Sequence, residues 1–283
     1  FQGMAQSQLT QKYLYEIGIA DSLYSEVLEE QRDIWIKLPE YYTPNSSKKY
    51  PVIYVLDGGV QMKALATVCS YYEGHFLPDM ILVGISNRSH RMRDLTTSHV
   101  QMRHGGVVRE ETGGAENFIR FIESELIPYI DSKLPTSSYR TLIGHSFAGL
   151  FTIHTLIKHP NLFANYIAID PSLDWDDQKL LKEAQLSLQH ESLAGKSLYV
   201  SLSAASLHMQ NGEITMENVM MDTSDYTLFA RSIIEFSEFA EDQKQNGLNF
   251  SWQHYPNDLH GTVPLPSIRD GLTFLFEWYQ LES

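Results

Sequence analysis

The stretch GHSFA, residues 144–148, places a serine between a short apolar run and a helical pattern. In the nucleophile-elbow motif G-x-S-x-G, a strained strand-to-helix turn holds the serine hydroxyl above a sheet. It also leaves the next backbone N–H at a helix start, where it can stabilise an oxyanion. Ala148 stands where the second glycine is expected, and Gly149 follows one position later. Because alanine is also small, the motif predicts that Ser146 is a nucleophile; a plain small-residue turn is the alternative.

A serine nucleophile needs a base that accepts its proton near neutral pH, and histidine is the usual choice. In hydrolases with this motif the order along the chain is Ser, acid, His, with the His after the last strand. Of the 11 histidines, His260 occupies that place. We therefore expect His260 to be the general base and His145, beside the serine, to shape the turn.

A tetrahedral intermediate needs two donors for its oxyanion, one of them from a loop after an earlier strand. The stretch VLDGGV, residues 55–60, offers two glycines at such a strand end. The amides of Gly59 and Phe147 are the predicted oxyanion hole. A simple Gly-Gly turn is the alternative for the first of them.

The acid that orients the histidine is the least determined member of the site. It normally follows the penultimate strand, yet after SLYVSL no carboxylate occurs before Glu213, with Asp222 and Asp225 further on. Three hypotheses stay open: an acid from this long segment, with Glu213 and Asp222 as candidates; an acid from another strand end, such as Asp170 or Asp174; or a Ser-His dyad.

Apolar, β-branched runs alternate with helical patterns along the whole chain, and these elements must position the residues above. Strands are predicted at 24–31, 32–39, 51–59, 81–86, 140–146, 166–172, 196–203 and 249–256, and helices at 113–134, 147–160, 227–247 and 267–280. This alternation predicts an α/β fold with a mostly parallel central sheet and helices on both faces. Functional residues of such sheets collect at the carboxyl ends of the strands.

The length of 283 residues suits one α/β domain, expected at 4–283, because Phe1-Gln2-Gly3 resembles the scar of a cleaved expression tag. The segment 203–225 contains four methionines whose flexible thioethers could line a cap over the pocket. A methionine-rich helix packed on the core is the alternative. We find no internal repeat or linker.

Composition narrows the classes of partner. The formal net charge of −14 argues against nucleic acid, and the arginine-rich stretch at 88–109 carries no nucleic-acid motif. No apolar run is long enough to span a membrane. The single cysteine, Cys69, has no partner for a disulfide or a metal site, so it says nothing about the compartment. The expected partner is a small-molecule ester, with no metal or organic cofactor; neither compartment nor oligomeric state can be read.

Four stretches occur together in order: YPVIYVLDGG, GGAENFIRFIESELIPYID, RTLIGHSFAGLFTIHTLIKHPNLF and YPNDLHGTVPLPSIRDGLTFLF. Together they resemble the putative-esterase family of α/β-hydrolases, and within it the siderophore esterases of the enterobactin and salmochelin type. The resemblance covers nearly the whole chain from about residue 24. It implies the α/β-hydrolase fold, Ser146 and His260 as catalytic pair, and Gly59 and Phe147 as oxyanion donors. The resemblance to salmochelin-type esterases also gives precedent for a Ser-His dyad that works without an acid.

The sequence thus predicts a serine carboxylic-ester hydrolase that works through an acyl-enzyme at Ser146, with a siderophore-type ester as the substrate that the resemblance suggests. Acyl transfer to an alcohol or sugar would use the same groups. A non-catalytic binding module on the same fold is the alternative from another class.

Overall fold

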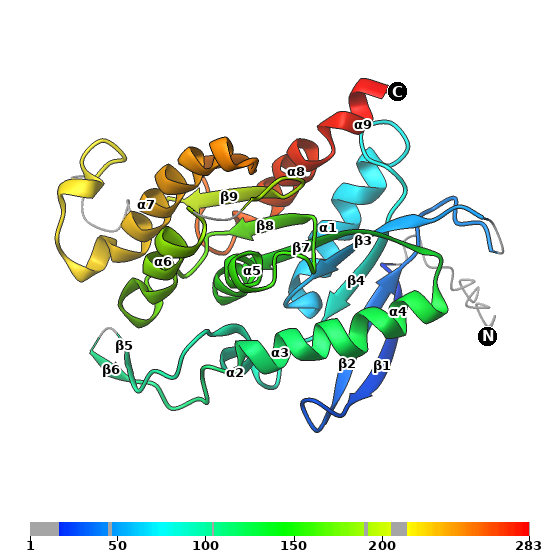
Figure 1. The fold of residues 1–283 in the computed structure, drawn as a ribbon, viewed down its shortest axis with the longest axis horizontal. Helices are drawn as coiled ribbons and strands as arrows, with labels where there is room; N and C mark the ends of the chain where they lie inside the picture. The colour runs from blue at the N-terminus through cyan, green and yellow to red at the C-terminus, as the bar shows by residue number, and fades with distance from the viewer. Residues whose placement is uncertain (1–16, 45–46, 104, 190–191, 205–213, 283) are drawn as a thin grey trace, which may run out of the picture.

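The computed structural model describes residues 17–44, 47–103, 105–189, 192–204 and 214–282. An eight-stranded sheet runs through them in the order β1-β2-β4-β3-β7-β8-β9-β10 (Figure 1). Its strands are β1 (Ile19–Ser25), β2 (Glu30–Lys37), β3 (Tyr50–Val55), β4 (Ile81–Ile85), β7 (Thr136–His145), β8 (Asn165–Ile169), β9 (Ser197–Ser203) and β10 (Asn249–Tyr255). β1 and β2 are antiparallel to their neighbours, and the six strands from β4 to β10 are parallel. The predicted mostly parallel sheet is confirmed.

Helices cover both faces of the sheet. The α-helices between the strands are α1 (Gly58–Tyr72), α2 (Arg91–Leu95), α3 (Ala115–Phe121), α4 (Ile127–Lys133), α5 (Phe147–Lys158), α6 (Trp175–Ser187) and α7 (Leu228–Asp242). After the last strand come α8 (Pro264–Leu275) and α9 (Glu277–Glu282). A π-helical turn, Ile122–Leu126, joins α3 to α4. A two-stranded hairpin of β5 (Met102–Arg103) and β6 (Gly106–Val107) stands apart from the main sheet.

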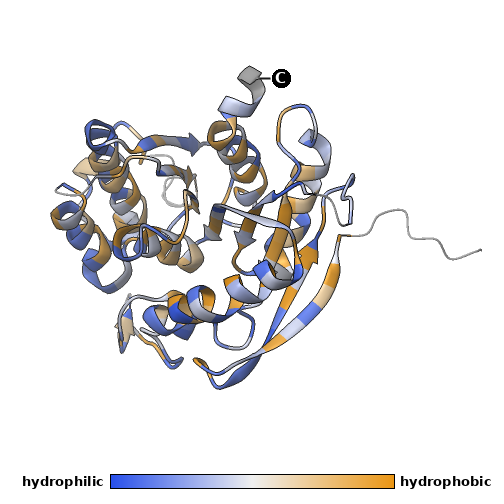
Figure 2. Cartoon of the chain, turned by 45° about the vertical axis from the view of Figure 1, so that its right-hand side comes forward, coloured by the Kyte–Doolittle hydropathy of each residue, from blue (hydrophilic) through white to orange (hydrophobic). Residues whose placement is uncertain are grey.

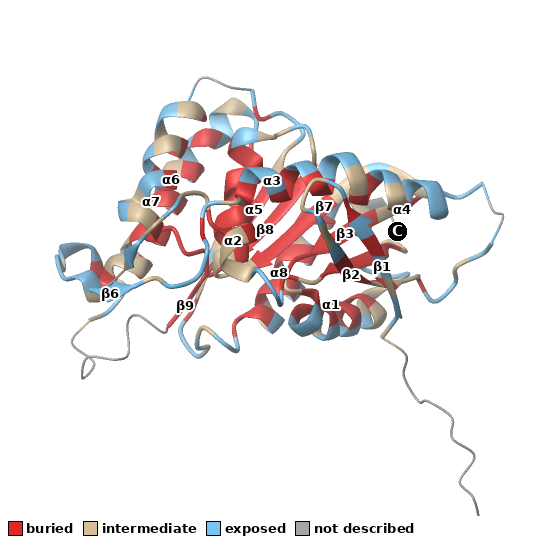
Figure 3. Cartoon of the chain, turned by 90° about the horizontal axis from the view of Figure 1, so that it is seen from below, coloured by how far each residue is buried: buried red, intermediate tan, exposed pale blue. Residues whose placement is uncertain are grey.

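The hydrophobic core has two parts because successive side chains of a strand point to opposite faces. Along β3, Val52 and Tyr54 belong to the part beneath α3, α5, α6 and α7. Ile53 and Val55 belong to the part beneath α1 and α8. Figure 3 shows the buried strands between these two helical layers, and Figure 2 shows that the central strands are mainly hydrophobic. Helices thus pack on both faces of the sheet and hold the strand ends in place relative to one another.

Some predicted boundaries were wrong. The first strand was expected at 24–31, but β1 ends at Ser25 and a turn follows, in which Glu29 has a φ of 56°. The last helix was expected to be continuous, but it divides between α8 and α9. Helices α1 and α6 were not predicted at all, although α1 carries one of the proposed oxyanion donors.

The expected cap segment is only partly described. Residues 205–213, with Met209 and the candidate acid Glu213, lie outside the described residues, as does the expected tag scar at 1–3. Beyond them Met216 packs against the core, whereas Met220 and Met221 are exposed. A cap role for this segment stays a prediction. No helix in the described part of the chain has the length and hydropathy needed to cross a membrane.

Candidate active site

Ser146 lies at the sharp turn between β7 and α5, as the motif predicts. Its φ of 64° and ψ of −119° are unusual for a residue with a side chain, and such strain marks a nucleophile elbow. Close packing explains the two glycines of the stretch. A Cβ on Gly144 would lie 2.6 Å from Thr152 Oγ1, and one on Gly149 would lie 2.9 Å from Pro171 Cα. Ala148 is buried in the core, so its methyl group fits where the motif expects glycine.

His260 follows β10 and meets a carboxylate from another strand end, one of the three alternatives that the sequence left open. Its Nδ1 lies 2.7 Å from Oδ2 of Asp170, the residue directly after β8. The Asp170 side chain is fully buried, while that of His260 is 40% exposed. An imidazole held at Nδ1 by a carboxylate has a fixed tautomer, which leaves Nε2 as the base.

Asp170 is itself held by the neighbouring strand. Its Oδ1 accepts a hydrogen bond of 2.7 Å from the Ser203 amide, and its Oδ2 one of 2.5 Å from the Ser203 hydroxyl. The Asp170 amide donates to the Ser201 carbonyl at 3.0 Å. A buried carboxylate is costly unless it is hydrogen-bonded, and these donors meet that need. β9 therefore orients the acid, although it does not carry it.

The turns that hold Ser146 and Asp170 are joined. The Ser146 amide donates to the Ile169 carbonyl at 2.9 Å, and the Ser172 amide donates to the Ser146 carbonyl at 3.1 Å. The hydroxyls of Ser146 and Ser172 are 3.4 Å apart. Because β7 and β8 are adjacent parallel strands, nucleophile and acid leave the same edge of the sheet.

The structure does not bring the candidate acid Asp222 to His260. Its carboxylate accepts hydrogen bonds of 2.5 Å from the hydroxyls of Ser224 and Thr227, which lower the pKa of Asp222. Asp174, another strand-end alternative, pairs with Arg103 at 2.7 Å. Asp170 thus replaces Asp222 as the acid that the geometry supports. The sequence did contain this alternative, as a carboxylate at the end of a buried strand.

The two predicted oxyanion donors both lie in the first turn of a helix. Phe147 is the first residue of α5, and Gly59 is the second residue of α1. First-turn amides have no acceptor within their own helix and lie at its positive end, so they suit an anion. A Cβ on Gly58 would lie 2.7 Å from the Gly84 backbone, whereas one on Gly59 would meet only Trp35. Gly58 is therefore needed for packing, whereas Gly59 is exposed and has room for a Cβ in ordinary contact with Trp35.

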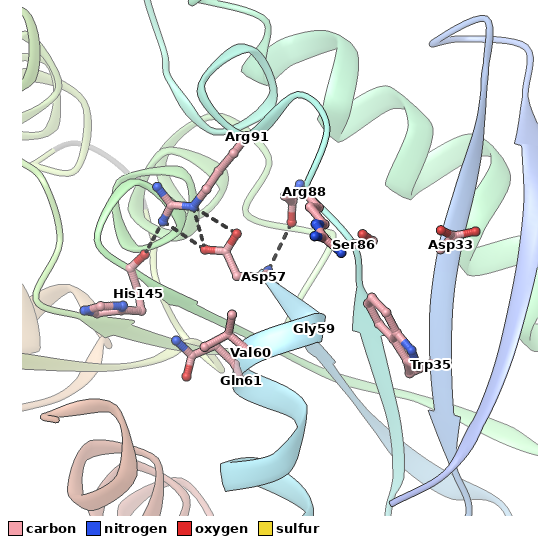
Figure 4. A pocket seen from close by; sticks show the side chains of 11 residues that line it. Asp33, Trp35, Asp57, Gly59, Val60, Gln61, Ser86, Arg88, Arg91 and His145 are labelled. Atoms are coloured by element: carbon pink, nitrogen blue, oxygen red, sulfur yellow. Dashed lines mark hydrogen bonds and ion pairs between the residues drawn. The ribbon is translucent and has the colours of Figure 1, made fainter. Parts of the chain in front are cut away.

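A cavity of about 710 Å³ adjoins this site (Figure 4). It is lined by Asp33, Trp35, Asp57, Gly59, Val60, Gln61, Ser86, Asn87, Arg88, Arg91 and His145. Because Gly59 and His145 both line it, the predicted oxyanion donor and the residue before Ser146 border the same cavity. Of the arginines at 88, 91 and 93, the first two line the cavity, while Arg93 pairs with Glu30 and Asp94.

His145 packs against His260, with ring centroids 4.4 Å apart. Burial, followed by the charge of His260, lowers the pKa of His145 to about 4, so this ring stays neutral at ordinary pH. Among the described residues, the one set of three potential metal ligands whose atoms all lie within 4.8 Å is His145, Asp170 and His260. Since Asp170 and His260 are hydrogen-bonded to each other, we interpret these three residues as an acid–base group and not as a metal site.

A family model described as putative esterase matches residues 25–256. Among curated proteins, the ferri-bacillibactin esterase BesA of Bacillus subtilis is 31% identical over 197 residues, which are 64% of this chain and 68% of that protein. A siderophore enterobactin esterase of Emericella nidulans is 28% identical over 184 residues, 59% of this chain and 57% of that protein. The alignments thus span about three fifths to two thirds of these relatives.

Solved structures share the fold over more of the chain. An IroE-like serine hydrolase from Shewanella oneidensis has a TM-score of 0.80 and 31% identity, with 92% of this chain and 80% of that chain covered.

Proposed function

Because the chain belongs to the putative-esterase family of α/β-hydrolases, we propose that it hydrolyses a carboxylic ester through an acyl-enzyme on Ser146. The observation that carries this mechanism is the 2.7 Å hydrogen bond between His260 and the buried Asp170, beside the Ser146 turn. A histidine held in this way activates a serine hydroxyl for attack on a carbonyl.

In the first half-reaction the Ser146 oxygen attacks the ester carbonyl carbon while His260 Nε2 takes the hydroxyl proton. Negative charge develops on the carbonyl oxygen, and the amides of Gly59 and Phe147 stabilise it. Asp170 stabilises the imidazolium without taking its proton. The tetrahedral intermediate then collapses: the bond to the leaving alkoxide breaks, and His260 returns the proton to it.

In the second half-reaction a water molecule attacks the acyl-enzyme, and His260 removes one of its protons. The second tetrahedral intermediate breaks its bond to the Ser146 oxygen, which recovers a proton from His260. The products are a carboxylic acid and an alcohol, and each proton is accounted for by the same imidazole. No metal or organic cofactor enters these steps.

The proposed substrate is an ester of a siderophore. The relatives BesA and the Emericella protein are named as esterases of such compounds. The cavity beside Gly59 supports this choice, because its volume of about 710 Å³ suits a ligand larger than a simple acetate ester. Its lining combines the indole of Trp35 with polar groups of Asn87 and Arg88, which fit an aromatic ligand rich in hydrogen-bonding groups.

The mechanism is tested by replacing Ser146 with Ala and assaying hydrolysis of p-nitrophenyl butyrate and labelling by a fluorophosphonate probe. We expect loss of both, with a folded protein. The matched control is Ser172→Ala, which removes a hydroxyl 3.4 Å away and should keep the labelling. Turnover that persists in purified Ser146→Ala would contradict the mechanism.

The substrate class is tested separately with bacillibactin and enterobactin. Mass spectrometry should detect hydrolysed ester products, at a kcat/KM above that for p-nitrophenyl butyrate. Hydrolysis of the simple ester alone would leave the mechanism standing and reject the siderophore proposal. Inclusion of an alcohol acceptor in the same assay shows whether the acyl group passes to water or to the acceptor.

A further inference from the structure

Arg91 connects the two chain segments that carry the proposed oxyanion donors. Its Nε lies 3.0 Å from both carboxylate oxygens of Asp57, and one terminal nitrogen lies 2.9 Å from Asp57 Oδ2. The same terminal nitrogen donates to the His145 carbonyl oxygen at 3.3 Å. Figure 4 shows the guanidinium between Asp57 on one side and His145 on the other.

Asp57 fixes the start of α1. It is the residue before Gly58 and has a left-handed backbone, with φ 52° and ψ 41°. Its carbonyl accepts from the amides of Val60 and Gln61 at 2.8 and 3.0 Å, and its own amide donates to Asn87 at 3.1 Å. Any movement of Asp57 therefore moves the first turn of α1, and with it the Gly59 amide.

His145 and Phe147 flank Ser146 on the other side of the bridge. The Arg91 guanidinium carbon lies 5.5 Å from the centroid of the Phe147 ring, within the range of a cation–π contact. The Arg91 side chain thus contacts three groups: the His145 carbonyl before Ser146, the Phe147 ring after it, and the Asp57 carboxylate at the start of α1.

An oxyanion hole works only when both donors point at the position where charge develops, and small displacements cost large factors in rate. The planar guanidinium suits this task because it can bind a carboxylate with two groups in a fixed geometry. Arg91 is partly exposed, with 33% of its side chain accessible, so its ion pair contributes little to global stability. Its main effect should therefore be on geometry at the site.

We propose that Arg91 is a positioning residue that sets the separation and direction of the Gly59 and Phe147 amides. This inference rests on the proposed esterase mechanism and adds to it a residue that touches neither the scissile bond nor the proton path.

The test compares Arg91→Ala and Arg91→Lys with the wild-type protein, using p-nitrophenyl butyrate and a trifluoromethyl ketone that forms a hemiketal with the active-site serine. Because the donors act on the transition state, kcat for Arg91→Ala should fall about 10- to 100-fold, with KM changed by less than about 3-fold. The Ki of the ketone should rise by the same factor as kcat/KM falls. Arg91→Lys should recover part of both losses.

Two further variants separate bridging from stacking and from misfolding. Arg103→Ala removes the other guanidinium over the Phe147 ring, at 5.0 Å, but Arg103 has its ion pair with Asp174 and not with Asp57. It should raise the Ki of the ketone much less than Arg91→Ala does. Asp57→Asn keeps the shape of the carboxylate and removes its charge. Asp57→Asn should raise the Ki of the ketone as much as Arg91→Ala does. The double variant should raise this Ki little further.

Unchanged ketone affinity in folded Arg91→Ala, or a loss confined to KM, would overturn the proposal. If Arg91→Ala does not fold, Arg91→Lys and Asp57→Asn decide in the same way. Ser146→Ala is assayed alongside: if it keeps turnover, the esterase mechanism itself fails. An inactive Ser146→Ala together with wild-type ketone affinity in the Arg91 variants rejects the positioning role alone.

Discussion

The Nδ1 atom of His260 lies 2.7 Å from Oδ2 of Asp170, across the edge of the sheet where β8 and β10 end. Ser203, on the strand between them, donates to Asp170 through both its amide and its hydroxyl. His260 is thus oriented by the carboxylate that directly follows β8, the strand beside β7, while Ser203, the last residue of β9, supports that carboxylate.

Replacement of Asp170 by Asn should lower kcat by about 10⁴-fold, because the amide favours the wrong imidazole tautomer. The matched control is Asp222→Asn, which changes a carboxylate bonded to Ser224 and Thr227 and should cost less than about 10-fold. Steady-state kinetics on p-nitrophenyl butyrate measure both. Equal losses in the two variants would count against Asp170, and a small loss in Asp170→Asn would favour a dyad.

The Gly59 amide can be removed without removing a side chain. Proline is tolerated in the first turn of a helix, and Gly59 is the second residue of α1. Gly59→Pro should therefore fold and lose about 10²- to 10³-fold in kcat. Gly59→Ala keeps the N–H, and its Cβ would lie 3.5 Å from Trp35, an ordinary contact, so its loss should be far smaller. Similar kcat values for the two variants would exclude this amide from the oxyanion hole.

His145 should make the folded state sensitive to acid. Burial, then the charge of His260, lowers its pKa from 6.5 to about 4. Between these values the unfolded chain binds a proton that the folded protein does not, so stability falls as the pH falls. Relative to His145→Gln, the free energy of unfolding of the wild-type protein should fall by on the order of 3 kcal/mol between pH about 7 and about 4. Urea unfolding of both proteins across this range checks it; a constant difference would refute the expectation.

Gly144 should be indispensable for folding. A Cβ there would collide with the backbone carbonyl of Ala148 and lie 2.6 Å from Thr152 Oγ1. Gly144→Ala should therefore lose about 3 kcal/mol or more of unfolding free energy. Gly261→Ala, whose Cβ would have no neighbour within 4 Å, is the control and should stay within about 0.5 kcal/mol. Comparable denaturation midpoints would contradict the packing argument.

The sequence predicted the family, the α/β-hydrolase fold and an ester-hydrolysing enzyme, and the comparisons confirm these. These predictions depended on local patterns: buried strands that alternate with helices, and a serine motif between one strand and one helix. The structure places Ser146 and His260 at strand ends, as expected, and their roles remain part of the proposal.

The acid could not be chosen in the same way. Asp170, Asp174 and Asp222 all follow strands or strand-like runs, so sequence position does not separate them. The choice depends on which carboxylate the order β7-β8-β9-β10 brings to the loop that carries His260. That order is a long-range property of the sheet.

Helix α1 was missed for a different reason. Its first residues are two glycines, which are poor helix formers, and the strand-like run before it was extended across them. The Asp57–Arg91 bridge was missed with it, because its residues are 34 positions apart and only the fold makes them neighbours.

Because the candidate acid Asp170 directly follows β8, the segment after β9 does not have to supply it. Since Ser203 ends β9 and already supports the acid, the described residues 214–227 need not supply a group for proton transfer. Mutations in this stretch can change its length, flexibility or polarity while bond cleavage proceeds as before. Under the proposed mechanism this stretch can therefore diverge independently of selection for catalysis, and chimaeras that exchange it between relatives should remain active enzymes.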